Sequence, residues 1–270
     1  MSRGKIAPPT VIRTPRSSIR WTLELLRDLT FQRVALRYKE TFLGFGWILL
    51  QPVALTVIFT YIRRVATISS GNIPYPLFAA VGLVGWSFTA LAITQSLPSF
   101  VANAPMLKRV ALPKAVFPVS AVLSTVADLL VMLTLVAGLF IYCHFPLTWT
   151  ALWVPLVFTA QLLFLVSLGS LIALVNVLLR DLGHAVPHLL WLWFFASPVF
   201  YPASMVPREF QTLARWNPMA GFLESYRAIL LSGEPPPLHW FGPALIVTTV
   251  TVLAAAVAFW RTEGTLVDLL

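Results

Sequence analysis

AVFPVSAVLSTVADLLVMLTLVAGLFIYCHFPLTWTALWVPLVFTAQLLFLVSLGSLIALVNVLL, residues 115–179, is a run of 65 residues with one formal charge, Asp128. A second run, residues 65–107, has 43 residues and no formal charge. A helix needs about 20 apolar residues to cross the hydrocarbon layer of a bilayer, and an ionised side chain at its centre costs about 3 kcal/mol. Soluble proteins do not have uncharged runs of this length. The pattern therefore predicts an all-α, polytopic integral membrane protein.

The whole composition agrees with this prediction. The 270 residues are 58% hydrophobic and 11% charged, with a mean hydropathy of +0.83. One cysteine, Cys143, excludes an intramolecular disulfide and a cysteine-based metal cluster. The net charge of +9 does not indicate nucleic acid, because nine of the nineteen Lys and Arg residues fall within the first 44 positions. A basic segment next to a membrane span is typical of a topology signal that faces anionic lipid.

Apolar runs and charges divide the chain into three regions. Residues 1–16 are expected to be a disordered basic tail, residues 17–40 an amphipathic helix in the interface plane, and residues 41–270 a domain of six transmembrane helices. The expected spans are residues 45–62, 77–97, 115–142, 152–179, 187–206 and 241–260. With the N-terminus inside, inner segments hold fourteen Lys and Arg residues and outer segments hold five. The positive-inside rule therefore predicts that both termini are cytosolic.

Two connecting segments have a composition or a length that calls for separate interpretation. The inner loop, residues 98–114, combines apolar residues with Lys108 and Arg109, which suits either docking onto another protein or a simple connector that carries topology charges. The outer segment, residues 207–240, is longer than a connection needs to be. Its stretch Met219–Leu231 has a helical pattern, with Glu224 and Arg227 spaced for an ion pair on one face. We expect short re-entrant helices there, between spans five and six.

The sequence offers no catalytic machinery of its own. The Walker pattern G-x-x-x-x-G-K-[S/T] does not occur, and the four histidines lack the spacing of metal ligands. We therefore expect no enzyme activity, no catalytic residues and no metal site in this chain.

Asp128 is the one acid expected within a membrane span. An acid at that depth often marks a proton or ion pathway. It can equally be a structural group that is hydrogen-bonded to Ser, Thr or Gln on neighbouring spans. A carrier coupled to protons normally has more than one such group, which favours the structural interpretation.

Aromatic residues are concentrated in the expected spans beyond what an interfacial belt needs. Aromatic faces stacked along a conduit suit the apolar faces of sugar rings and allow a polymer to slide. The candidates for such a lining are Trp47, Trp86, Phe88, Trp191, Phe194, Phe195, Phe200 and Tyr201.

A set of motifs, in order along the chain, resembles the permease subunits of polysaccharide-exporting ABC transporters of the ABC-2 type. The motifs are Arg27-Asp28-Leu29, Arg37-Tyr38-Lys39, Leu43-Gly44-Phe45-Gly46-Trp47 with Gln51-Pro52, Gly82-Leu83-Val84-Gly85-Trp86-Ser87-Phe88, Asn103 with Leu107-Lys108 and Leu112-Pro113, Arg180-Asp181-Leu182, Ser197-Pro198-Val199-Phe200-Tyr201-Pro202, Val206-Pro207, Trp216-Asn217-Pro218, Glu224 and Arg227. The family is expected to have Pro where Gly85 stands, so this sequence departs from it there.

The resemblance implies an exporter of lipid-linked glycans such as O-antigen, capsule or teichoic acid, located in the bacterial cytoplasmic membrane. Two copies would form the conduit, and each would pair with a separate P-loop ATPase that holds ATP and Mg²⁺, so this chain itself would need no cofactor. By resemblance, the ATPase-coupling loop comprises Asn103, Met106, Leu107, Lys108 and Arg109. A second inner loop contains Arg180 and Asp181, and an outer gate region contains Glu224 and Arg227.

Three other functions are compatible with parts of the pattern. A drug- or lipid-exporting ABC-2 permease would share the fold. A proton-coupled carrier would use Asp128 and would need no ATPase. A membrane-embedded glycosyl or phosphoryl transferase would need charged residues clustered at one interface, and the sequence has only scattered ones.

Overall fold

The computed structural model describes residues 19–39, 44, 46–66, 73–109, 113–262 and 265–266, and all regular elements within them are helices. The expected basic tail, residues 1–16, lies outside the described residues. In chain order the elements are α1 (Ile19–Tyr38), α2 (Gly46–Ala66), α3 (Tyr75–Ser96), α4 (Ser99–Ala102), α5 (Ala104–Arg109), α6 (Val116–Tyr142), η1 (Trp149–Trp153), α7 (Val154–Leu178), α8 (Leu182–Ala196), η2 (Ala203–Met205), η3 (Arg208–Phe210), α9 (Gln211–Trp216), α10 (Pro218–Arg227), the π-helical turn η4 (Ala228–Ser232) and α11 (Leu238–Thr262).

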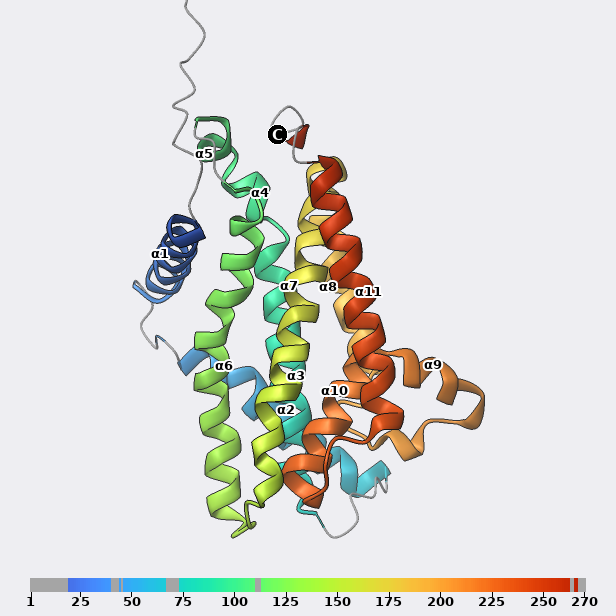
Figure 1. Cartoon of the computed structure of the whole chain (residues 1–270). Coiled ribbons are helices and arrows are strands. Elements are labelled where there is room, and N and C mark those ends of the chain that lie inside the picture. Colours follow the sequence, from blue (N-terminus) through green and yellow to red (C-terminus); the bar gives the residue numbers. More distant parts are fainter. Residues whose placement is uncertain are drawn as a thin grey trace, which may run out of the picture.

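The predicted integral membrane fold is confirmed. Five helical stretches of the described chain are long and apolar enough to cross a membrane, namely α2, α3, α6, η1 with α7, and α11. They form an elongated bundle, with the short helices α4 and α5 at one end and α9 and α10 toward the other (Figure 1). The outer stretch Met219–Leu231 is helical as predicted, because α10 continues directly into η4.

The fifth span is where the sequence prediction was wrong in its limits. It was expected over residues 187–206, but α8 begins at Leu182 and ends at Ala196. The helix stops because Pro198 follows closely, and proline disfavours helical backbone at the residue before it. Pro187, by contrast, is accommodated inside α8. With 15 residues, α8 is roughly 22 Å long, shorter than the hydrocarbon layer of about 30 Å.

Helix α3 is the centre of the bundle. Residues 75–96 are mostly buried, and α3 packs against α2, α6, α7, α8 and α10. Helices α2 and α11 lie at the periphery, and most of their residues face outward. Glycine and alanine along α3 allow its neighbours to come close, which is how membrane helices gain packing energy.

A smaller apolar cluster closes the end of the bundle where α4 and α5 lie (Figure 1). Its buried members are Phe100, Leu107, Phe117, Ala173, Leu174, Val177 and Leu266. Leu29 of α1 and Phe259 of α11 pack against it. The cluster therefore joins the 98–109 region to the ends of α6, α7 and α11, and we call it the inner cluster after the predicted inner loop that contributes to it.

Helix α1 lies outside the bundle, against α6 (Figure 1). None of its residues is fully buried, and Ile19 and Phe31 are among its exposed apolar side chains. Helix α1 thus covers part of the flank of the membrane domain, and its place in the interface plane stays a prediction.

Candidate functional site

The chain leaves helical conformation at residues 197–202, directly after α8, and this segment is the core of the candidate site. The backbone carbonyls of residues 198–201 accept no helical hydrogen bond. Irregular backbone inside a membrane protein is tolerated only where protein or water satisfies its polar groups. The segment therefore needs hydrogen-bond donors from elsewhere in the fold.

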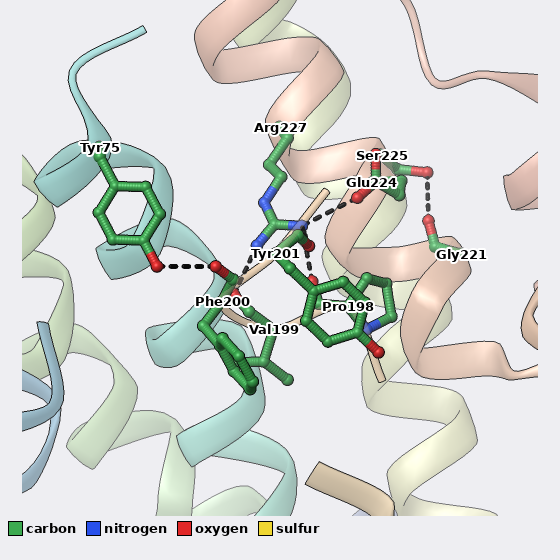
Figure 2. A network of polar contacts seen from close by, with 9 residues as sticks. All are labelled: Tyr75, Pro198, Val199, Phe200, Tyr201, Gly221, Glu224, Ser225 and Arg227. Atoms are coloured by element: carbon green, nitrogen blue, oxygen red, sulfur yellow. Dashed lines mark hydrogen bonds and ion pairs between the residues drawn. The ribbon is translucent and has the colours of Figure 1, made fainter. Parts of the chain in front are cut away.

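Arg227, the last residue of α10, supplies most of these donors (Figure 2). Its Nη1 donates to the carbonyl oxygen of Pro198 at 2.6 Å and, more weakly, to that of Tyr201 at 3.4 Å. Its Nη2 donates to the carbonyl oxygen of Val199 at 2.5 Å. Tyr75, the first residue of α3, donates its hydroxyl to the Phe200 carbonyl at 2.8 Å. Each of the four carbonyls at residues 198–201 thus has a donor.

The charge of Arg227 is balanced locally. Its side chain is only 4% exposed and forms an ion pair with Glu224 of the same helix, with Nη1 2.8 Å from Oε1. The guanidinium carbon also lies 3.8 Å from the centre of the Phe78 ring, a cation–π contact. A buried cation is tolerated only when it is paired and hydrogen-bonded. The i,i+3 pair predicted from the sequence is therefore confirmed, while Tyr75 and Phe78 carried no signal that sequence reasoning could use.

Gly82 of α3 makes room for this arrangement. A methyl group at this position would overlap the Val199 carbonyl oxygen and would lie 2.6 Å from Arg227 Nη2. Only glycine at this position lets both the 197–202 segment and the Arg227 guanidinium pack against α3. The next glycine of the motif, Gly85, would meet the Leu223 side chain at 2.9 Å, and its carbonyl accepts hydrogen bonds from Gln161 and Thr89.

Asn217 ties the outer segment to the end of α8. Its side chain accepts from the Met219 amide at 3.1 Å, which caps α10, and from the Trp193 indole at 3.0 Å. Its amide nitrogen donates to Ser197 Oγ at 2.9 Å. Asn followed by Pro218 is a helix-start signal, so the sequence could indicate the cap, but not the contact with Trp193.

The eight candidate aromatics separate into two groups. Trp86, Phe88 and Phe194 are 6%, 0% and 2% exposed, so the structure places them in the core of the chain. The rings of Trp47, Trp191 and Phe195 are more than half exposed, and those of Phe200 and Tyr201 are partly exposed. Within one copy of the chain, the second group supplies most of the exposed aromatic surface, while Trp86 and Phe194 reach it only in a groove between α2, α3 and α8.

Part of the second group forms a contiguous aromatic face. The Phe195 ring lies 6.2 Å from Trp191 and 6.1 Å from Phe200, centre to centre. Phe200 in turn stacks on Phe59 of α2 at 4.3 Å with nearly parallel planes. The face runs from the middle of α8 to the 197–202 segment.

A wide cleft of about 910 Å³ adjoins this face. Its walls come from the end of α8, the 200–207 segment and α9, and include Trp193, Phe200, Tyr201, Phe210, Trp216 and Asn217. A smaller groove of about 170 Å³ lies between α2, α3 and α8 and is lined in part by Gln51, Trp86 and Trp191. Aromatic walls with a few amide groups can hold a ligand that has both apolar faces and hydroxyls.

The inner-loop candidates lie at the opposite end of the bundle. Leu107 is buried in the inner cluster, whereas Met106 and Lys108 of the same helix, α5, are exposed. Asn103 donates to the Ser99 carbonyl at 2.7 Å and so links α4 to α5. Arg109 ends α5, and its side chain lies outside the described residues.

Arg180 and Asp181 are exposed in the turn between α7 and α8. Because α7 ends in the inner cluster, this turn lies at the same end of the bundle as α4 and α5.

Asp128 of α6 is fully buried and fully paired. Arg37 forms an ion pair with one carboxylate oxygen, and Tyr38 donates its hydroxyl to the other. Burial raises the pKa of the Tyr38 phenol to about 12, and the hydrogen bond to Asp128 adds to the rise, so the phenol stays a donor at neutral pH. The partners were expected to be Ser, Thr or Gln on neighbouring spans, but both contacts of the carboxylate come from α1, one from a cation and one from a phenol.

Comparison with known proteins places these features in context. The family model described as ABC-2 type transporter matches residues 25–231. The chain is 32% identical over 239 residues to the O-antigen export system permease protein RfbA of Myxococcus xanthus, covering 87% of this chain and 91% of the relative. It is 30% identical to a protein of the same name from Klebsiella pneumoniae, covering 79% of this chain and 82% of the relative. The polysialic acid transport protein KpsM of Escherichia coli is 25% identical, with 87% and 92% covered. The matched residues include Asp128, the 197–202 segment and Arg227.

Proposed function

Because this chain belongs to the ABC-2 type transporter family, we propose that it is the membrane-spanning subunit of an ATP-driven exporter of a lipid-linked polysaccharide. The observation that carries the proposal is similarity over most of the chain to two permeases named for O-antigen export, at 30% and 32% identity. A relative named for polysialic acid transport, at lower identity, agrees with a glycan cargo. The cargo class is an O-antigen, capsule or teichoic-acid-like glycan, and the membrane is the bacterial cytoplasmic membrane.

The energy for transport comes from a separate ATPase subunit, which carries ATP and Mg²⁺. The sequence has no nucleotide-binding motif, and the chain is multi-pass and membrane-embedded. The exposed side chains of α5, Met106 and Lys108, offer a docking surface beside the turn that contains Arg180 and Asp181. Leu107 would act differently, because it is buried in the inner cluster. Its packing contacts would transmit a movement of α5 to the ends of α6 and α7. Both termini are then cytosolic.

Two copies of the chain form the conduit. Support comes from the exposure of α2 and of Trp47, Trp191 and Phe195, which together leave a large apolar and aromatic face uncovered in one copy. Such a face on a membrane protein is consistent with a helix-packing partner or a lumen. A lumen walled by aromatic rings suits a glycan, whose ring faces are apolar and whose hydroxyls remain hydrated.

The outer segment forms the exit. Arg227 does not meet the cargo, because its guanidinium is almost fully buried in contacts with the 197–202 segment and with Glu224. The role of this ion pair is to hold the break after α8 and the base of α10 in one arrangement. The aromatic cleft beside it, which α9 helps to form, is then held as a rigid wall of the exit.

The alternative of a proton-coupled carrier is disfavoured by the surroundings of Asp128. Both carboxylate oxygens already accept from Arg37 and Tyr38. Among the described residues, no second acid is fully buried with it. A drug- or lipid-exporting permease remains the runner-up, since it would share the helices but would not need the aromatic face.

Disruption and co-purification test the proposal. Loss of this gene should trap the glycan inside the cell, and surface glycan should return with the wild-type chain. Co-expression with its ATPase partner should yield a complex with two copies of each subunit. Trp191→Ala with Phe195→Ala should lower surface glycan without reducing assembly, while Leu253→Ala, an exposed residue of α11, is the matched control. Normal surface glycan in the disruptant would reject the proposed cargo.

A further inference from the structure

Asp128 is a buried charge that the proposed transport cycle does not use. It lies 12 residues after Val116, the first residue of α6, which is roughly 18 Å along the helix axis. Its side chain has no exposed surface. Ionisable groups in such positions pair with one another or mark a pathway.

The partners of Asp128 are consecutive residues at the C-terminal end of α1, although they are about 90 positions away in the sequence. Arg37 Nη1 pairs with one carboxylate oxygen, and Tyr38 donates to the other. Arg37 Nη2 also donates to Ser124 Oγ, one turn earlier on α6, at 3.1 Å. The guanidinium thus bridges two residues of α6, and the geometry fixes both the position and the rotation of the α1 end.

The other charged pairs of α1 do not reach the bundle. Arg20 pairs with Glu24, and Arg27 with Asp28, in exposed contacts within the helix itself. Leu29 adds an apolar contact with the inner cluster. An arginine on an amphipathic helix normally extends toward lipid headgroups, but Arg37 is directed to a buried carboxylate and is only 21% exposed.

We propose that Asp128 is a positioning residue: it is the receptor on α6 for Arg37 and Tyr38, and it locks α1 onto the membrane domain. With Leu29 held at the inner cluster, the lock makes α1, the α4–α5 region and α6 one mechanical unit. The inference goes beyond the proposed export function and does not depend on which cargo is moved. It also gives the single charge in the long apolar run a definite role.

A double-mutant cycle tests the lock. Arg37→Met leaves the buried carboxylate without its cation and should lower the ratio of folded to unfolded protein in detergent by about 100-fold or more. Asp128→Leu should cost less, because the freed Arg37 can extend to the interface. The double variant should be more stable than Arg37→Met alone. Arg20→Met, which breaks an exposed pair on the same helix, should stay within about fivefold of wild type. Additive losses in the cycle would contradict the proposal.

Spin labelling separates positioning from stability. In a Cys143→Ser background, a label at Phe31→Cys, an exposed site on α1, should be immobile in wild type. It should become mobile in Asp128→Leu and partly mobile in Tyr38→Phe. It should stay mobile in the double variant even though stability has returned. A label that stays immobile in Asp128→Leu would overturn the lock. Transport abolished by Asp128→Leu but spared by Arg37→Met would instead identify an ion site.

Discussion

The two buried charges, Arg227 and Asp128, are stabilised in opposite ways. Arg227 is neutralised by Glu224 three residues away, and its Nη1 and Nη2 also donate to backbone carbonyls of the 197–202 segment. Asp128 has no charged neighbour along α6 and is neutralised by Arg37 of a helix that lies outside the bundle. Arg227 stabilises the non-helical segment after α8 inside the fold, whereas Asp128 attaches the peripheral helix α1 to α6.

The difference explains what removal of each partner should do. The carbonyls at residues 198–201 cannot move to water when Arg227 is removed, because the segment is packed against α3. Arg37, in contrast, is partly exposed on the flank of the bundle, and a long arginine side chain can extend toward lipid headgroups. Loss of Arg227 should therefore damage the bundle, whereas loss of Asp128 should mainly release α1.

The largest expected effect is that of Arg227→Met. It leaves Glu224 without its cation and strips donors from three carbonyls, so the free energy of unfolding should fall by about 3–5 kcal/mol. Unfolding in detergent micelles measures this change. Arg208→Met, at an exposed site of the same outer segment, is the control and should change stability by less than about 0.5 kcal/mol. Equal stability of the two variants would mean that the carbonyls have other donors.

Gly82→Ala should have the next largest effect. The added methyl group overlaps the Val199 carbonyl oxygen, so the 197–202 segment must shift, at a cost of about 1–3 kcal/mol. Gly138→Ala on α6, where nothing lies within 4 Å of the new methyl, is the matched control and should be neutral or slightly stabilising. Both are measured by the same unfolding experiment. If Gly82→Ala behaved like Gly138→Ala, the close packing of the segment on α3 would be refuted.

These comparisons also show which features a sequence can predict. The membrane spans follow from long uncharged runs, and Glu224–Arg227 follows from helical spacing, so both were predicted. The limits of α8 were wrong because apolar composition continues through residues 197–206 while Pro198 ends the helix. The partners of Asp128 could not be predicted, because Arg37 lies 91 residues away and only the folded bundle brings α1 to α6. Tyr75 was missed for the same reason, since it meets Phe200 across 125 residues.

Asn217→Ala should have a moderate effect. It removes the cap of α10 and the acceptor for the Trp193 indole, and a lost cap costs about 1 kcal/mol. Asn217→Asp keeps both acceptor contacts and should recover most of the lost stability in thermal unfolding. A full loss in Asn217→Asp would assign the effect to the donor contact with Ser197 instead.

The smallest effect on stability is expected at the inner end. Lys108→Glu together with Arg109→Glu changes α5, where Lys108 is exposed, so unfolding should be nearly unchanged. Stimulation of the partner ATPase should nevertheless be lost, because reversed charge disfavours docking. ATPase rates of the purified complex measure this, with Lys114→Glu, a single charge reversal outside α5, as the control. An unchanged stimulated rate would count against docking at this loop.

Vectorial transport in proteoliposomes tests the central claim most directly. The purified chain is reconstituted with a lipid-linked glycan, with and without its ATPase partner and ATP, and glycan that becomes accessible on the far side is measured. We predict movement only when the partner and hydrolysable ATP are both present. Movement by this chain alone, driven by a proton gradient or by no nucleotide at all, would contradict the account.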